Sequence, residues 1–110
     1  MSHPRFQLYR GRNGKFFFNL SAKNGQTILQ SEGYASRVGA KNGIKAVKAC
    51  SKRAKLYDRR TAKNGTYYFV LNSPNGQVVA KSQMYRSASG RANGLKSVMA
   101  NASGAKIAEE

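Results

Sequence analysis

Few residues in this sequence could carry out acid–base, nucleophilic or metal chemistry. His3 is the only histidine, and so close to the N-terminus it would lack the fixed position that a general base requires. Cys50 is the only cysteine, and without a histidine to activate it we interpret it as a small, partly buried thiol rather than a nucleophile. No pair among the acidic residues has the spacing of an acid/base dyad, and no zinc-binding spacing is present; the acids are Glu32, Asp58, Glu109 and Glu110. We therefore predict no catalytic residue, no metal site, no cofactor and no small-molecule substrate.

The segment GAKNGIK, residues 39–45, combines glycines with lysines in the manner of some phosphate-binding loops. It lacks the G-x-x-x-x-G-K-[ST] order, and we expect it within a helix rather than in a loop after a strand. We therefore predict that the protein is not an enzyme.

Basic residues give a stronger indication of binding. Five of them recur at spacings of 4, 4, 3 and 4 along a predicted helix, which places them in a stripe beside its apolar face; they are Arg37, Lys41, Lys45, Lys48 and Lys52. This basic stripe is a candidate for phosphate contact with DNA or RNA. A solvated helix face explains the same residues, and both interpretations stay open.

The composition agrees with a polyanionic partner. Twenty Lys and Arg against four acids give a net charge of +16 in 110 residues, which favours nucleic acid or another polyanion because many neutralised phosphates release many counterions. A surface that serves only solubility is the alternative. A single cysteine excludes an internal disulfide, and neither a signal segment nor an apolar run of about 20 residues is present. We expect a cytoplasmic protein without a membrane segment, as a monomer or homodimer.

The elements that must position these residues occur twice. NGKFFFNLSAKNGQ at residues 13–26 returns as NGTYYFVLNSPNGQ at 64–77, and an ungapped shift of 51 residues continues the match to the C-terminus. We therefore predict one domain, 1–110, made of two tandem repeats, 5–56 and 57–110. Neither repeat is long enough to bury a sheet and a helix alone, so we expect both to share one core.

Each repeat has the pattern β-β-β-α-β. In repeat one, alternation predicts strands over Phe6–Tyr9, Lys15–Ser21 and Gln26–Ser31, joined by Asn-Gly turns. Ser36 and Ser87 are predicted helix N-caps, and helical spacing extends from Arg37 to about Cys50. Paired glycines in each helix suggest a close approach of the helix to the sheet; they are Gly39, Gly43, Gly90 and Gly94. Short strands at 54–56 and 105–107 are expected to close the repeats.

A second candidate surface follows from the alternation of the strands. If the helices cover one face of the sheet, then Phe17, Tyr68 and Tyr9 point to the other face. Aromatic residues on an open sheet stack on bases in several proteins that bind single strands. The nearby basic residues are Arg10, Arg12, Arg59, Arg60 and Lys63. Cross-strand packing or burial in a dimer is the alternative explanation.

The doubled motifs resemble the YegP-like family of small bacterial proteins. The resemblance covers nearly the whole chain and depends on Asn-Gly-x-(Phe/Tyr)-(Phe/Tyr)-Phe-x-Leu, Asn-Gly-Gln, Ser-x-x-Tyr-x-Ser and Asn-Gly-(Ile/Leu)-Lys-x-Val, each present twice. It implies an α+β fold in which both repeats form one antiparallel sheet with exchanged closing strands and two helices packed on it. It implies no activity, because the family has no established biochemical function.

The function that the sequence favours is therefore nonspecific binding of nucleic acid or another polyanion. A protein-interaction or self-associating module, with the charge serving solubility, is the alternative.

Overall fold

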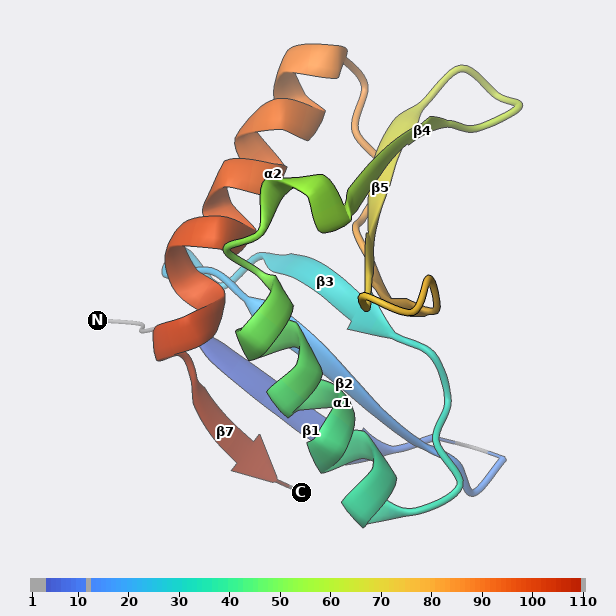
Figure 1. The fold of residues 1–110 in the computed structure, drawn as a ribbon, viewed down its shortest axis with the longest axis vertical. Coiled ribbons are helices and arrows are strands. Elements are labelled where there is room, and N and C mark those ends of the chain that lie inside the picture. Colours follow the sequence, from blue (N-terminus) through green and yellow to red (C-terminus); the bar gives the residue numbers. More distant parts are fainter. Residues whose placement is uncertain (1–3, 12, 110) are drawn as a thin grey trace.

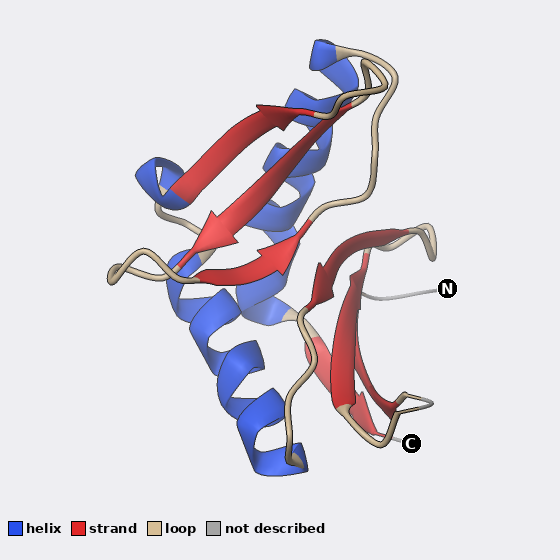
Figure 2. Ribbon diagram, turned by 90° about the vertical axis from the view of Figure 1, so that its right-hand side faces the viewer, coloured by secondary structure: helices blue, strands red, loops and turns tan. Residues whose placement is uncertain are grey.

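The protein folds into one seven-stranded sheet with two helices packed on one of its faces (Figures 1 and 2). The coordinates are a computed structural model that describes residues 4–11 and 13–109. Repeat one contributes β1 (Arg5–Arg10), β2 (Phe16–Ser21), β3 (Thr27–Ser31) and α1 (Arg37–Cys50). Repeat two contributes β4 (Tyr57–Thr61), β5 (Tyr67–Asn72), β6 (Val78–Lys81), α2 (Ala88–Asn101) and β7 (Lys106–Glu109). Short 3₁₀ helices, η1 (Ala54–Leu56) and η2 (Ala102–Gly104), follow α1 and α2.

The strand order is β4-β5-β6-β3-β2-β1-β7, so that the third strands of the two repeats meet in the middle. β3 and β6 pair antiparallel through Gln30–Lys81 and Ser31–Ala80. This junction joins the two repeats into one sheet, as the sequence predicts.

The predicted faces of the strands are confirmed. Phe18 and Leu20 are fully buried toward the helices, and so are their counterparts Phe69 and Leu71. The small and apolar residues that recur at helical spacing along α1 are fully buried: Ala40, Ile44, Val47 and Ser51, the last of which lies just past the helix end as its C-cap. Both repeats contribute to a single apolar core between the helices and the sheet.

The Asn-Gly dipeptides between consecutive strands lie at tight hairpin turns, as predicted. In the β2–β3 turn the Gly25 amide donates to the Ala22 carbonyl at 2.9 Å, and the Asn24 side chain accepts from the Gln26 amide at 3.0 Å. Gly25 has φ +85°, a conformation that residues with a Cβ rarely adopt. The dipeptide therefore ends a three-residue loop rather than forming a two-residue turn.

Both helices begin at the predicted serine caps. The Ser36 hydroxyl accepts from the Gly39 amide at 3.0 Å, and Ser87 accepts from Gly90 at the same distance. The close approach of helix and sheet occurs at the second glycine of each pair. A Cβ on Gly43 would lie 2.7 Å from Tyr34 Cζ and 3.0 Å from Phe18 Cε2, and one on Gly94 would overlap the Tyr85 ring in the same way.

Two details differ from the expectation of an all-antiparallel sheet with exchanged closing strands. β7 does cross to repeat one, but it pairs parallel with β1, so the sheet is mixed. The expected closing strand at 54–56 is instead the 3₁₀ helix η1, which leads directly into β4. η1 ends at Leu56 and β4 begins at Tyr57, so residues 54–56 have no room to form a closing strand of their own before the first strand of repeat two; the exchange is one-sided.

Candidate nucleic-acid interface

The basic stripe of α1 lies on the helix side of the molecule. Arg37 is half-buried with its guanidinium carbon 5.1 Å from the centre of the Phe16 ring, and Lys48 Nζ is 5.8 Å from the Phe6 ring. Lys41 is also half-buried, whereas Lys45 is exposed. Residue Lys52 is exposed too but falls beyond the end of the helix at Cys50, in the turn that follows it. Two of the five stripe residues, Arg37 and Lys48, therefore lie over aromatic rings, which limits their freedom to follow a phosphate backbone.

No helix formed by the described residues lies over the opposite face of the sheet (Figure 2). Residues paired across neighbouring strands share a face, so the registers place a row of side chains across this open face. The row runs through Gln7, Asn19, Gln30, Lys81, Val70 and Asp58. Except for the buried Val70, the row is polar and partly accessible.

One aromatic pair lies at the β1–β2 end of the open face. Tyr9 and Phe17 are direct cross-strand partners, and their rings stack with centres 5.8 Å apart and planes 21° apart. Glycines border the Phe17 ring, because a Cβ on Gly11 would lie 3.0 Å from its Cδ1 and one on Gly33 would lie 3.2 Å from its Cζ. The two rings are half-buried, which leaves part of each available for stacking.

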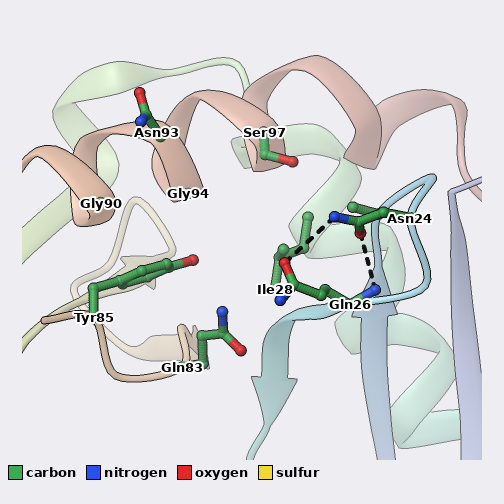
Figure 3. Close-up of a pocket in the computed structure, with 10 residues that line it drawn as sticks. Asn24, Gln26, Ile28, Gln83, Tyr85, Gly90, Asn93, Gly94 and Ser97 are labelled. Carbon is green, nitrogen blue, oxygen red and sulfur yellow. Dashed lines mark hydrogen bonds between the residues drawn. The ribbon is translucent and has the colours of Figure 1, made fainter.

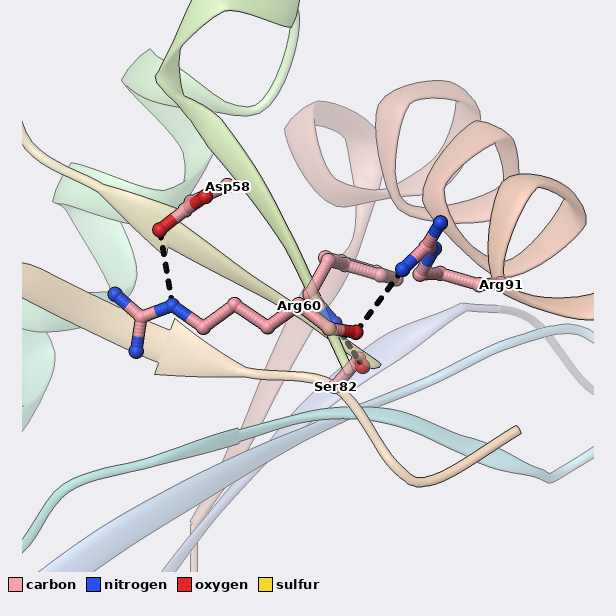
Figure 4. Close-up of polar contacts among 5 residues, drawn as sticks. Asp58, Arg60, Ser82 and Arg91 are labelled. Atoms are coloured by element: carbon pink, nitrogen blue, oxygen red, sulfur yellow. Dashed lines mark hydrogen bonds and ion pairs between the residues drawn. The ribbon is translucent and has the colours of Figure 1, made fainter. Parts of the chain in front are cut away.

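The third predicted aromatic, Tyr68, lies at the other end of the open face. Lys81 Nζ is 4.9 Å from the centre of the Tyr68 ring, close enough for a cation–π contact. Arg60 is the cross-strand partner of Tyr68, and its Nε donates to Asp58 Oδ2 at 2.9 Å (Figure 4). A half-buried ring beside two basic side chains suits single-stranded nucleic acid: a base can stack on the ring while the neighbouring phosphates contact the basic groups.

The open face therefore holds the three predicted aromatics in two clusters. Three strand spacings and four residues along the strands separate Phe17 from Tyr68, which corresponds to roughly 20 Å. We use the name open-face site for the set Tyr9, Phe17, Tyr68, Arg60 and Lys81. Sequence reasoning missed Lys81, because its place beside Tyr68 depends on the register between β5 and β6.

The other predicted basic residues lie elsewhere. Arg10 belongs to the helix-facing set of β1, with its guanidinium carbon 5.9 Å from the Phe16 ring. Arg59 has the same phase as the buried Tyr57 and so also points away from the open face. Lys63 is exposed in the β4–β5 turn, and Arg12 falls outside the described residues, as do His3 and Glu110.

A hollow of about 270 Å³ lies between the β2–β3 turn and α2 (Figure 3). Carboxamides and hydroxyls line it, among them Asn24, Gln26, Asn93 and Ser97, and the Tyr85 ring extends into it. Burial raises the pKa of Tyr85, so this hydroxyl stays protonated well above neutral pH. Because its lining contains no charged side chain, the hollow offers neutral hydrogen bonding.

The residues considered for catalysis are dispersed. Cys50 is buried in the core with 5% of its surface exposed. Over the described ranges 4–11 and 13–109, no three His, Cys, Asp or Glu residues gather as a potential metal site. The same ranges contain no helix with the length and apolar character to cross a membrane.

Comparison with known proteins identifies the family. Two segments, residues 12–58 and 62–109, match the family described as "Domain of unknown function (DUF1508)". The chain is 43% identical over 96 residues to the UPF0339 protein YegP of Escherichia coli K12 and 44% identical over 96 residues to a UPF0339 protein of Shewanella oneidensis, in each case covering 87% of both chains.

The fold agrees with this relationship. The solution structure of E. coli yegP, a protein of unknown function, superimposes with a TM-score of 0.93 at 37% identity and covers 100% of this chain and 95% of the other. The solution structure of the Shewanella oneidensis protein gives 0.91 at 41% identity, over 99% and 92% of the two chains. Matched twice by the same motif and superimposable from end to end, the chain belongs to the DUF1508 family of YegP-like proteins, a family of unknown function.

Proposed function

We propose that this protein is a binding module without catalytic activity that takes single-stranded nucleic acid on the open face of its sheet. The observation that carries the proposal is the open-face site, where half-buried aromatic rings stand beside Arg60 and Lys81 on a face that no helix covers. Stacking on such rings is tolerant of sequence because every base has a π-face, so we expect little sequence preference.

The charge of +16 supports the same proposal, because it attracts a polyanion from a distance and strengthens each phosphate contact at low salt. The two aromatic clusters are separated by roughly 20 Å of sheet, so a ligand must be several nucleotides long to reach both. Affinity for oligonucleotides should therefore rise with length until both clusters are occupied and then level off. The affinity of a polyanion without bases should not level off at the length that reaches both aromatic clusters.

The test is fluorescence anisotropy with labelled oligo-dT and oligo-U of increasing length, titrated with salt, with heparin as competitor. Phe17→Leu and Tyr68→Leu keep apolar bulk but remove the aromatic face, and each should weaken binding about tenfold. Lys81→Gln should reduce the slope of log K against log salt by about 0.7. Lys96→Gln, which removes the same charge from an exposed position of α2, is the matched control and should leave the slope nearly unchanged.

Two results would contradict the proposal. Equal effects of Lys81→Gln, Lys96→Gln and Lys45→Gln, with no effect of Phe17→Leu, would mean a polyanion binder without a stacking site. Absence of binding near physiological salt would leave the charge as a solubility feature and favour the alternative, a protein-interaction or self-associating module.

A further inference from the structure

β4 is the strand at one edge of the sheet, and its equivalent in repeat one is not an edge. β1 lies between β2 and β7, whereas β4 has a strand neighbour on one side only, β5. The difference follows from the one-sided exchange described above. β7 crosses from repeat two to lie beside β1, but residues 54–56 of repeat one form η1, so no described strand occupies the corresponding position beside β4.

The backbone of β4 presents hydrogen-bonding groups toward this position. Arg59 lies opposite Phe69, whose amide donates to Ser82 Oγ at 2.9 Å and whose carbonyl accepts from the Ser82 amide at 2.9 Å (Figure 4). Because Phe69 uses both groups on the β6 side, the N–H and C=O of Arg59 point outward from the sheet. The same holds for Thr61, since Tyr67 opposite it exchanges both backbone hydrogen bonds with Tyr85.

The β1–β7 pair supplies the register of a strand at this edge. There Phe6 lies opposite Ile107, Gln7 opposite Ala108 and Leu8 opposite Glu109. A shift of 51 residues carries this register to β4, so an incoming parallel strand would place an apolar residue beside Tyr57, a small one beside Asp58 and an acidic one beside Arg59. Repeat one has the fully buried Leu8 where repeat two has an exposed arginine, so only the β4 edge selects an acid at that position.

The neighbouring charges favour the same occupant. Asp58 is paired with Arg60 on the open face at 2.9 Å, which leaves Arg59 to meet the incoming strand. Arg91 reaches from α2 to donate to the Arg60 carbonyl at 3.0 Å, which places a further positive charge near the edge (Figure 4). A second copy of the chain would bring another +16 against this edge, and like charges at an interface are costly.

We propose that the outer edge of β4 docks an extended acidic segment of a partner protein as a parallel eighth strand, with the pattern apolar–small–acidic. Main-chain hydrogen bonds to the edge provide the affinity in this mode of recognition, and the side-chain pattern provides the specificity. The surface lies at Arg59 on the helix-facing side of the strand, so it is separate from the open-face site and does not depend on it.

The test is a titration of the ¹⁵N-labelled full-length protein with the acetylated peptide AKIAEE, the sequence of residues 105–110, followed by NMR. Amide shifts should concentrate at Tyr57–Thr61. The peptide AKIAKK should bind at least tenfold more weakly, and so should AKIAEE to the Arg59→Glu variant. AKIAKK should in turn bind Arg59→Glu better than AKIAEE does, a charge swap that a merely unfolded variant could not produce. Lys23→Glu, the same charge change in the β2–β3 turn, is the control and should bind AKIAEE like the wild type.

Three outcomes would overturn the proposal. Shifts at Phe6 and Leu8 instead would mean that the peptide displaces β7 from β1. Unchanged spectra at millimolar peptide would mean that the charges of β4 only protect the edge from pairing. A concentration-dependent dimer whose interface contains β4 would make a second copy, not an acidic partner, the occupant.

Discussion

Repeat one and repeat two place the same strand in different surroundings. β1 has a neighbouring strand at each of its two edges, and its residues Phe6 and Leu8 are fully buried. At the matched positions β4 has Tyr57, which remains buried, and Arg59, which is exposed at the sheet edge. A duplicated unit within one chain therefore need not form two equivalent halves, because the segment that joins them has to serve both. The sequence of β4 differs from that of β1 at Arg59, which lies on the edge that the joining segment leaves uncovered.

Loss of a core aromatic should test whether the two repeats share one core. Phe18 packs against Phe6 at 5.9 Å and Tyr34 at 6.1 Å between ring centres, while Phe69 packs against Tyr57 at 5.7 Å. Phe18→Ala and Phe69→Ala should each lower the free energy of unfolding by about 3–5 kcal/mol. Urea unfolding followed by circular dichroism should give one transition for each variant. Two separated transitions would mean that the repeats fold independently.

The close approach of helix and sheet predicts the next largest effect. Gly43→Ala adds a Cβ against the Tyr34 and Phe18 rings, and such overpacking costs about 1–3 kcal/mol despite the better helix propensity of alanine. Gly39→Ala is the matched control on the same helix, where the nearest atom is Ser36 Oγ at 3.3 Å, and should change stability much less. Thermal melts of the two variants measure the difference. Equal melting temperatures would contradict a role of Gly43 in helix–sheet packing.

Tyr57 distinguishes repeat two from repeat one by its hydroxyl, because Phe6 occupies the matched position. The hydroxyl donates to the Ser51 carbonyl at 2.5 Å, so Tyr57→Phe leaves that buried acceptor unpaired and should cost about 1–2 kcal/mol at neutral pH.

Burial also raises the pKa of Tyr57 above its ordinary value of about 10. The folded protein therefore keeps this proton where the unfolded chain has lost it. The contribution to stability is complete below pH 10 and declines as the pH rises above 10. Denaturant midpoints from pH 8 to 11 should fall more steeply for the wild type than for Tyr57→Phe, and parallel curves would contradict this origin.

The helix caps should show the smallest effect and the closest equality between the repeats. Ser36→Ala and Ser87→Ala each remove one hydrogen bond of the same length to the third helical amide, at about 1 kcal/mol. Ser36→Thr and Ser87→Thr keep the acceptor and serve as controls. A loss at one cap twice that at the other would show that the helices do not contribute equally to the shared core.

Local patterns predicted most of this fold because the residues that carry them act over short distances. The Asn-Gly turns, the serine caps and the alternation of Phe16, Phe17 and Phe18 each depend on neighbours a few positions away, and all were placed correctly. The parallel β1–β7 pair depends on residues about 100 positions apart, and no local signal distinguishes it from an antiparallel one. The prediction of a strand at 54–56 was wrong for a similar reason. These residues form η1 because β4 begins directly after them, and the pairing of β4 with β5 depends on residues elsewhere in the chain.

The candidate site likewise contains residues that local patterns predict and residues that depend on contacts between distant strands. Alternation placed Tyr9, Phe17 and Tyr68 on the face opposite the helices, where the structure has them. The same alternation puts Arg10 and Arg59 on the other face, because each is one residue out of phase with an open-face residue, Tyr9 and Arg60; proximity in sequence alone does not show this. Lys81 joined the site only through the β5–β6 register, which sequence spacing does not provide.

The parallel neighbour of β1 also has a consequence for the order in which the chain is made. Of the strands that the structure describes, β1 is made first and its partner β7 last. Until β7 has been made, the nascent chain carries Phe6 and Leu8 on a strand whose outer edge is still open. Vectorial synthesis thus gives no early advantage to repeat one: its first strand is covered only once β7 has been made and has folded back, which leaves the partly made chain in need of protection from aggregation.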